Sequence, residues 1–556
     1  MIDQQAAIDR PRGRASFGLD AVTAVWRYRL AFGLICAGAG LLSVMLGPDN
    51  YWDLRYYHLY APWAYLHDRY LYDIGPAQEQ GFLNPVADLL FYALISSPLN
   101  ETPRVVAFIM GAVHGVNAAL LLGIVCEVVR PVEAVERTTL RAVAWLMGVS
   151  GAGFISLLGT ATNDLTSALF VLASLFGLLR VAVRPAEGRA WRGFAAAGFW
   201  AGLGIGLKYT SAPYAPGLGA VLLLAAFRRR TVAGVIAYGA AAALAFLAVA
   251  GHHMLTLWRD FGNPTFPYLN QIFQSPYFEP TAIRDDRFIP AGFWQLITFP
   301  FRWTIADTYV AVEPAFRDWR AAIAYVAVAT ALLALVGRFL RGRQRAASAP
   351  APTRGFGLII TFATVSYFAW ALGFGYYRYA VPLEMLTGVV TVGALTFVFE
   401  DRLWRIIAAL AALVVAASTT VYLDWSTIGH GPSRLHYGDK YVDVEVPPLP
   451  DNGIVLIATW DPAAFFIPYA NPAVQYLSIE NNYLELSQNN KLATEVKRLM
   501  REPGRPKFVL NVDAFNPGKL NALLAHFDLR LGASPCEPIR TNLLGHALSL
   551  CPVAGD

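Results

Sequence analysis

The strongest constraint on the fold of this chain is a succession of long apolar segments. A helix needs about 20 mostly apolar residues to cross the hydrocarbon core of a bilayer, and such segments occur about eleven times. Of the 556 residues, 56% are hydrophobic and 15% are charged, a composition typical of integral membrane proteins and not of soluble enzymes. The predicted spans are residues 29–47, 104–128, 141–158, 165–182, 194–207, 213–227, 231–250, 321–337, 355–373, 380–399 and 405–422.

Arginines give these spans a predicted orientation. They gather before the first span and in every second connection after it, for example at 228–230. By the positive-inside rule these loops and the N-terminus lie in the cytoplasm, and an odd number of spans places the C-terminal region outside. No basic stripe typical of a nucleic-acid-binding face is present in the sequence. We therefore predict an integral protein of a bacterial inner (plasma) membrane.

The predicted topology divides the chain into three parts. Residues 1–28 form a cytoplasmic N-terminal tail, residues 29–423 a transmembrane domain, and residues 424–556 an extracytoplasmic domain. Two outer loops of the transmembrane domain are large, because their flanking spans lie far apart in the sequence. These loops comprise residues 48–103 and 251–320, and the first contains a short interfacial or re-entrant helix within Phe82–Pro98.

Short buried strands alternate with amphipathic helices in the C-terminal part, which predicts a small α/β domain. Cys536 and Cys551 both lie in it, and an oxidising compartment would allow them to form a disulfide. Without a glycine-rich nucleotide loop or metal-ligand spacing, this domain is expected to act as a lid or packing module. The strands are expected at 454–459, 474–479, 507–512 and 546–551, and the helices at 486–500 and 517–527.

The segment NYWDLRYYHLYAPW, residues 50–63, follows the first span and places Asp53, Arg55 and His58 among aromatic residues. Ionisable groups at this depth are costly to hold and often mark functional sites. Asp53 either takes a proton from an acceptor hydroxyl as a general base or is a solvated carboxylate on a juxtamembrane helix. Asp49, one helical turn earlier, either shares this site or caps the helix.

Two cations lie at the outer ends of later spans, against the general charge bias. Lys208 lies in the motif GLGIGLKYT, at the outer end of a span, and the glycines of this motif let helices approach closely. Arg378 is followed by Tyr379 just outside another span. Each cation either extends to the interface or contacts a phosphate. Asp164, in the motif TATND, is either a helix cap or a member of the same site. Together they suggest a phosphate-bearing lipid head group beside a base.

The order of these motifs resembles the GT-C membrane glycosyltransferases, in particular the protein-mannosyltransferase-like branch. The resemblance covers roughly residues 29–400. It rests on Asp53 in the first outer loop, Asn84-Pro85 before a short apolar helix, Asp164, the run AGLGIGLKYT and the Arg378-Tyr379 step.

The resemblance implies transfer of a sugar from a polyprenyl-phosphate donor to a lipid, glycan or protein acceptor on the outer face of the membrane. Asp53 matches the acidic residue that acts as base or positions the acceptor, and Lys208 and Arg378 match cations assigned to the donor phosphate. Leu54 stands where the family often has the second acid of an Asp-Glu pair, which leaves open whether a divalent metal takes part. The other candidate substrate-binding residues are Asp49, Arg55, His58, Asn84, Asp164 and Tyr379.

Three other functions compete with this one. A transporter of lipid-linked substrates would show internal repeats and helices broken near the midplane, whereas the polar residues here gather at one face. A polymerase or ligase of surface polysaccharide would share the lipid-linked substrate and use a large later loop, such as 251–320. A non-catalytic assembly subunit would bury Asp53 against Arg55.

Overall fold

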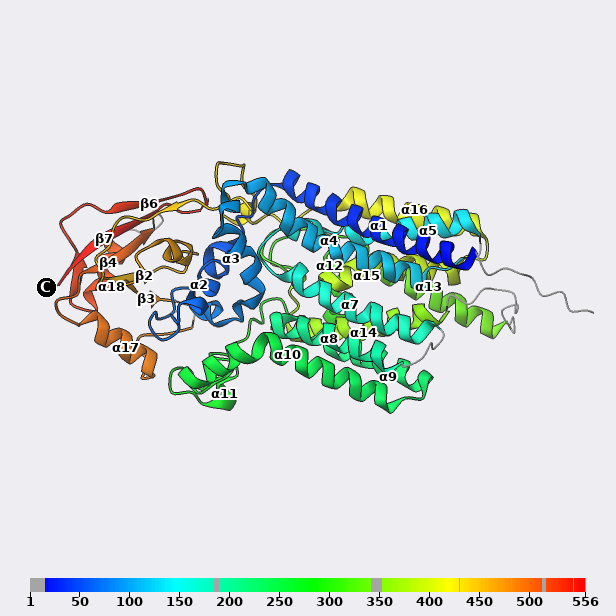
Figure 1. Cartoon of the computed structure of the whole chain (residues 1–556), viewed down its shortest axis with the longest axis horizontal. Helices are drawn as coiled ribbons and strands as arrows, with labels where there is room; N and C mark the ends of the chain where they lie inside the picture. Colours follow the sequence, from blue (N-terminus) through cyan, green and yellow to red (C-terminus); the bar gives the residue numbers. More distant parts are fainter. Residues whose placement is uncertain are drawn as a thin grey trace, which may run out of the picture.

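A computed structural model describes residues 16–131, 133–184, 190–341, 353–429, 431–481, 483–512, 517–543 and 545–555. A long bundle of helices carries the first outer loop and a C-terminal sheet at one end, where the C-terminus also lies (Figure 1). Residues 1–15 of the predicted N-terminal tail lie outside the described residues. Residues 16–28 are helical and continuous with the first span.

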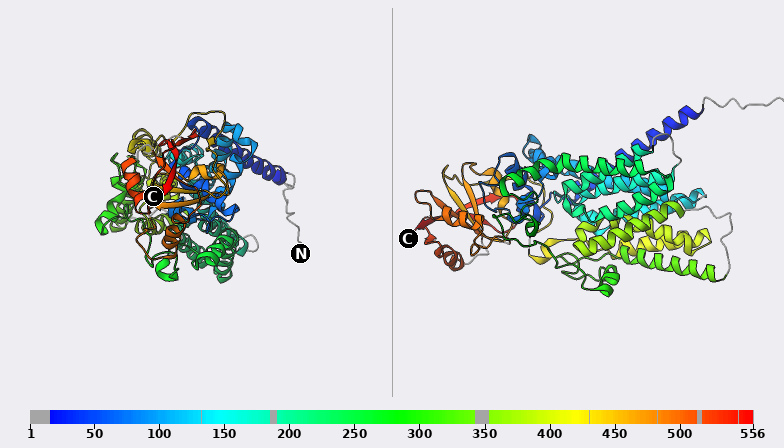
Figure 2. Two further views of the ribbon diagram at one scale, coloured as in Figure 1. Left: turned by 90° about the vertical axis from the view of Figure 1, so that its left-hand side faces the viewer. Right: turned by 90° about the horizontal axis from the view of Figure 1, so that it is seen from below.

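The bundle is built from helices that run along its length (Figures 1 and 2). Eight helices in the described part of the chain are long and apolar enough to cross a membrane. This confirms the prediction of an integral membrane protein. They are α1 (Ser16–Leu46), α4 (Pro103–Val128), α7 (Asp164–Val183), α10 (Val232–Phe261), α13 (Arg320–Leu340), α14 (Thr353–Gly373), α15 (Val381–Val398) and α16 (Arg402–Thr419).

Three somewhat shorter helices complete the bundle. These are α5 (Ala134–Val149), α8 (Trp191–Leu207) and α9 (Tyr214–Arg229), of 16, 17 and 16 residues. The predicted span 141–158 is interrupted, because the chain turns at Ser150 and Gly151 before α6 (Ala152–Leu157).

Glycines on α8 allow it to approach α10 closely. A Cβ on Gly198 or Gly202 would collide with the backbone carbonyl oxygen of Tyr238 or Ala242, one turn apart on α10. Small residues at this spacing are a common way for membrane helices to bring their backbones together. The glycine-rich helix α8 therefore packs against α10, and Lys208 is the residue that follows it.

The first outer loop contains only short helices, and so does the second beyond Phe261, because α10 continues past the predicted span into residues 251–261. The first holds the π-helical turn η1 (Leu54–His58), α2 (Tyr60–Leu66), and the predicted apolar element, which is a 3₁₀ turn η3 (Pro85–Asp88) followed by α3 (Leu89–Ile95). The second holds α11 (Asn270–Phe273) and α12 (Phe293–Arg302).

The C-terminal region forms one mixed sheet in the order β1-β6-β7-β4-β2-β3, with β5 paired to β7. Strand β2 runs parallel to β3 and β4, and the remaining pairs are antiparallel. The elements are β1 (Val444–Glu445), β2 (Ile454–Ala458), β3 (Gln475–Glu480), α17 (Lys491–Met500), β4 (Lys507–Val512), α18 (Pro517–Ala525), β5 (Leu529–Leu531), β6 (Glu537–Thr541) and β7 (Leu548–Gly555).

The four predicted strands correspond to β2, β3, β4 and β7, whereas β1, β5 and β6 carry no strong apolar pattern. Cys536, just before β6, is disulfide-bonded to Cys551 in β7, a pairing that the sequence allowed but left open. The disulfide therefore joins two neighbouring strands of the sheet.

The sheet is joined to the first outer loop. Aromatic residues of the loop, among them Tyr57 and Trp63, share a hydrophobic core with Phe466 and Tyr476 of the C-terminal region. Ile74 of the loop also forms a parallel bridge with Leu477 of β3, beyond the edge of the sheet. The two parts therefore form one packed unit rather than a bundle with a separate cap.

The arginine-rich connections lie at the opposite end of the bundle from the sheet (Figure 1). Glu127 at the end of α4 pairs there with Arg130 and Arg184, and Glu136 of α5 pairs with Arg405 of α16 at 3.1 Å. The fold thus separates an arginine-rich end from an end that bears the large outer loops. Arg189, Arg343 and Arg345 lie outside the described residues.

Candidate active site

The chain enters the first outer loop through a turn held by Asp49. This carboxylate is fully buried and accepts hydrogen bonds from the backbone N–H groups of Tyr51 and Ala161, at 2.9 and 2.7 Å. It therefore ties the start of the loop to the segment before α7. Asp53 follows four residues later, directly before η1.

Four of the candidate residues meet in one charge cluster, which we define as Asp53, Asp164, Lys208 and Arg378. The Arg378 guanidinium donates to both carboxylates, through Nη2 to Asp53 and through Nε to Asp164 at 3.1 Å. The Lys208 ammonium donates to Asp164 and to the carbonyl oxygen of Thr162, the latter at 2.6 Å. Positive and negative groups alternate through the cluster.

These four side chains come from segments far apart in the sequence. Asp53 precedes η1, Asp164 is the first residue of α7, Lys208 follows α8, and Arg378 lies in the 3₁₀ turn η6 (Tyr377–Ala380) before α15. All of these positions are element ends on the side of the bundle that carries the outer loops. The sequence-based prediction that they share one face agrees with this placement.

A second buried network holds η6 in place. The Tyr377 hydroxyl donates to Glu384 at 2.5 Å and to Asp318 at 3.1 Å. Glu384 in turn accepts the backbone N–H groups of Gly153 and Phe154 at 2.8 and 2.9 Å. Because Tyr377 precedes Arg378, these bonds orient the turn that presents the guanidinium. They also explain why the predicted span 141–158 breaks at Gly151.

The cluster is open at one end and closed at the other. The side chains of Asp53 and Lys208 are 17% and 13% exposed, whereas those of Asp164 and Arg378 are 1% and 5% exposed. A ligand therefore reaches Asp53 and Lys208 first. The buried Arg378–Asp164 pair forms the base of the site.

The surroundings of Asp53 keep it ionised. Burial acts to raise the pKa of this carboxyl, but the charges of Arg378, His58 and Lys208 together with the Arg378 hydrogen bond outweigh it, so the pKa lies below its usual value. At neutral pH Asp53 is therefore a carboxylate. An ionised carboxylate is the form that can accept a proton.

His58 and Asn84 act next to the cluster through other groups. His58 Nδ1 lies 2.6 Å from Asp88, which also accepts from Asn163, the neighbour of Asp164. The Asn84 amide donates to the carbonyl oxygens of Gly206 and Val249 at 2.7 and 2.9 Å, tying the loop to α8 and α10. Asp88 was not among the predicted site residues. It lies one turn after Asn84 in the same short helical element, and this position is the signal that could have indicated it.

Arg55 and Tyr379 differ in their distance from the cluster. Tyr379 places its ring 5.5 Å from the Lys208 ammonium. Arg55 is buried and contacts Gly545 of the C-terminal region, where a Cβ would meet the guanidinium. Burial lowers the pKa of Arg55 to about 10, while Asp461 and Asp49 act to raise it. Arg55 therefore faces the sheet, and Asp53 is paired with Arg378 instead.

Groups of three or more His, Cys, Asp or Glu side chains arranged to hold a metal ion are absent from the described part of the chain. The two carboxylates of the charge cluster are instead paired with cations.

Comparison with solved structures gives similarities over nearly the whole chain at low identity. Cupriavidus metallidurans ArnT bound to undecaprenyl phosphate is 11% identical, with 96% of this chain and 98% of that chain covered and a TM-score of 0.47. The Archaeoglobus fulgidus oligosaccharyltransferase in the apo form is 13% identical, with 88% and 70% covered and a TM-score of 0.43. Both TM-scores are too low to establish a common fold. No curated protein shows significant sequence similarity to the chain.

A family model provides the sequence evidence. Residues 89–254 match the family described as dolichyl-phosphate-mannose-protein mannosyltransferase. The matched segment contains Asp164 and Lys208 and lies between Asp53 and Arg378 in the sequence. Over residues 89–254 the chain is therefore similar in sequence to this mannosyltransferase family, as its motifs indicated.

Proposed function

We propose that this protein transfers a sugar from a polyprenyl-phosphate donor to a lipid, glycan or protein acceptor on the outer face of a bacterial inner membrane. The observation that carries the proposal is the convergence of Asp53, Lys208 and Arg378 in one partly exposed cluster at the loop-bearing end of the bundle. The N-terminus then lies in the cytoplasm and the sheet outside, as the arginine-rich end of the bundle implies.

The two cations of the cluster suit the phosphate of such a donor. A polyprenyl-phosphate sugar is a phosphodiester with one negative charge, and loss of the sugar leaves a phosphate monoester with more negative charge. Lys208 and Arg378 can stabilise this additional negative charge on the phosphate. Electrostatic stabilisation is most effective when it acts on charge that develops during the reaction. Because Lys208 is the more exposed cation, it makes the first contact and Arg378 the deeper one.

Asp53 is the proposed general base. The acceptor hydroxyl oxygen attacks the anomeric carbon, the bond between that carbon and the phosphate oxygen breaks, and its electron pair stays on the phosphate. The proton of the hydroxyl passes to Asp53. This single displacement inverts the anomeric centre and needs no covalent nucleophile, only positioning, a base and charge stabilisation.

Asp53 is paired with Arg378 when no donor is bound. A donor phosphate competes for the same guanidinium, and its charge offsets the positive charge that lowers the pKa of Asp53. Donor binding therefore makes Asp53 a stronger base at the moment the acceptor arrives. Asp164 keeps both cations in place, because its own contacts lie at the buried end of the cluster.

Transfer from radiolabelled polyprenyl-phosphate sugars in membranes tests this function. Asp53→Asn should lower the transfer rate by about 100-fold or more, the usual contribution of a positioned base. Asp286→Asn, at an exposed position of the second outer loop, is the matched control and should transfer at the wild-type rate. Full activity of Asp53→Asn would remove the base assignment. Activity of neither wild type nor control with any polyprenyl-phosphate sugar would remove the proposed donor class.

A further inference from the structure

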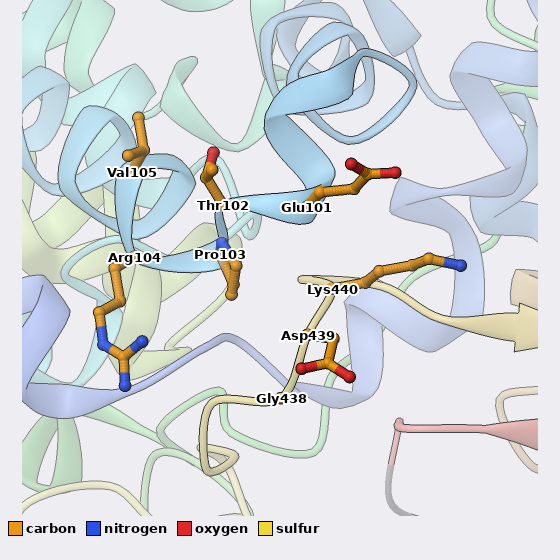
Figure 3. A pocket seen from close by; sticks show the side chains of 8 residues that line it. All are labelled: Glu101, Thr102, Pro103, Arg104, Val105, Gly438, Asp439 and Lys440. Atoms are coloured by element: carbon orange, nitrogen blue, oxygen red, sulfur yellow. The ribbon is translucent and has the colours of Figure 1, made fainter.

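A polar pocket lies apart from the charge cluster, at the outer end of α4 (Figure 3). It has a volume of about 670 Å³, within the range of small-molecule sites. Its walls come from residues 101–105 and 438–440, so the start of a membrane span faces the segment that leads into the sheet.

The wall formed by residues 438–440 is fixed at both ends. The Tyr437 hydroxyl donates to the carbonyl oxygen of Val44 in α1 at 2.9 Å. On the other side, the Asn100 amide bonds the backbone of Val442 twice, at 2.9 and 3.0 Å. The pocket is therefore held open between two anchored segments.

The Arg104 guanidinium gives the pocket a cation that stacks on an aromatic ring instead of pairing with a carboxylate. Its guanidinium lies 4.7 Å from the centre of the Tyr437 ring. Within the described ranges its donors make no hydrogen bond or ion pair with the protein. Stacking leaves the edge donors of a guanidinium available, which suits bidentate binding of a phosphate.

Two carboxylates complement this cation. Asp439 lies across the pocket from Arg104, and the side chain of Glu101 extends near that of Lys440 (Figure 3). Lys440 already has a carboxylate partner of its own, Asp443, at 3.1 Å. The pocket therefore offers one available cation and two available carboxylates, which favours a ligand that carries both an anion and a hydrogen-bond-donating cation.

The depth of the pocket identifies the source of such a ligand. Pro103 is the first residue of the candidate span Pro103–Val128, so the pocket lies where the bilayer head groups lie. Val105, the deepest apolar residue of the lining along the span, is 43% exposed and continues the pocket toward the acyl region. Cations at outer span ends run against the usual charge bias, which makes Arg104 informative.

We propose that this pocket binds the head group of a phospholipid that bears a phosphate and a primary ammonium, as in phosphatidylethanolamine. Arg104 binds the phosphate, and Asp439 and Glu101 accept hydrogen bonds from the ammonium. A trimethylammonium head group cannot donate these bonds, and an anionic glycerol head group leaves the carboxylates without a cation. The site is separate from the charge cluster and does not depend on the proposed transfer reaction.

Binding of short-chain phospholipids to the detergent-solubilised full chain tests the proposal, with affinity read from the shift in thermal unfolding. Dihexanoyl phosphatidylethanolamine should bind at least about tenfold more tightly than the choline or glycerol analogue, because each charge-assisted hydrogen bond is a strong one. Equal binding of the ethanolamine and glycerol lipids would overturn the proposal. So would equal binding of chain-free glycerophosphoethanolamine, because it would identify a soluble ligand.

Three variants test which residues bind the phosphate and the ammonium of the ligand. Arg104→Ala should weaken binding of the ethanolamine lipid by about tenfold or more, whereas Arg302→Ala, an exposed arginine on α12 outside the pocket, should not change it. Glu101→Gln combined with Asp439→Asn should make the ethanolamine and choline lipids bind equally. Unchanged selectivity in that double variant, or unchanged affinity in Arg104→Ala, would overturn the assignment.

Discussion

Arg69 and Asp73 form a buried bidentate ion pair where the first outer loop meets the C-terminal sheet. Arg69 Nε and Nη2 donate to the two oxygens of Asp73 at 2.9 and 2.8 Å, and further donors reach the carbonyl oxygens of Pro472 and Val474 at 2.7 and 2.6 Å. Asp73 also accepts the Tyr476 backbone N–H at 3.0 Å. The loop that carries Asp53 is therefore fastened to the sheet by charged, fully hydrogen-bonded groups.

Removing one partner of this pair should destabilise the outer part of the molecule. Arg69→Ala leaves the Asp73 charge buried without its cation, which typically costs about 3–5 kcal/mol. Thermal unfolding and proteolysis of residues 424–556 should both report the loss. Arg498→Ala removes an arginine from an exposed pair with Glu495 and is the control. Equal stability of the two variants would contradict a fastening role for Arg69.

Arg378 should matter for the chemical step more than for donor binding. Arg378→Lys keeps the charge but replaces the planar guanidinium, whose Nε and Nη2 donate to Asp164 and Asp53, by a single ammonium nitrogen, so kcat should fall by about 100-fold, as for loss of a group that stabilises developing charge. Initial rates at several donor concentrations separate kcat from KM. A rise in KM at constant kcat would show instead that Arg378 binds the donor equally in ground and transition states.

The pH dependence of transfer should reflect the lowered pKa of Asp53. Because that pKa lies below its usual value, the loss of kcat/KM that follows protonation of Asp53 should occur at a lower pH than for an unperturbed aspartate. In Arg378→Gln the positive charge is absent, so the pKa should rise and the acidic limb should move to higher pH. The pH profile of kcat/KM in both proteins measures the shift. An acidic limb at the same pH in both would exclude Arg378 as its cause.

Close packing of α8 against α10 gives a prediction for folding. Gly202→Ala places a Cβ against the backbone of Ala242 and should destabilise by about 1–3 kcal/mol. Gly219→Ala on α9 meets no atom within 4 Å and is the matched control. Thermal unfolding in detergent compares them. If both alanine variants unfold at the wild-type temperature, the helices do not approach as closely as the glycines allow.

The disulfide of the sheet should contribute measurably to its stability. Cys536 and Cys551 are separated by 15 residues, and closing a loop of this size contributes about 3 kcal/mol in the chain-entropy model. Cys536→Ser combined with Cys551→Ser should lower the unfolding temperature, and reductant should lower that of the wild type to the same value. If reductant also lowers the unfolding temperature of the double variant, its effect on the wild type is not due to this disulfide alone.

The sequence predicted the helices well because long apolar runs have few alternatives in a bilayer. Eight of the predicted spans coincide with helices long enough to cross, and Asp164, Lys208 and Arg378 lie at the helix ends expected. Their placement on the same side of the bundle as Asp53 follows from topology, since every second helix end lies on that side. The pairing of Asp53 with Arg378 requires side-chain geometry and could not be derived.

The residues whose surroundings could not be derived are those with partners far along the chain. The contacts of Asp49 with Ala161 and of Arg55 with Gly545 join segments whose approach no local pattern encodes. Short strands present the same difficulty. β1 and β5 have two and three residues, too few for an alternating pattern to emerge.

The bridge between Ile74 and Leu477 affects how readily the sheet pairs with other chains. Strand β3 ends the sheet, and an exposed edge strand offers unpaired backbone groups to any other extended chain. Here the Ile74 N–H donates to Tyr476 and the Ser478 N–H donates to Ile74, at 2.9 and 2.8 Å. The first outer loop thereby shields the edge against pairing with neighbouring copies, and a mutation that frees the loop exposes the edge of β3 as well as disturbing the charge cluster.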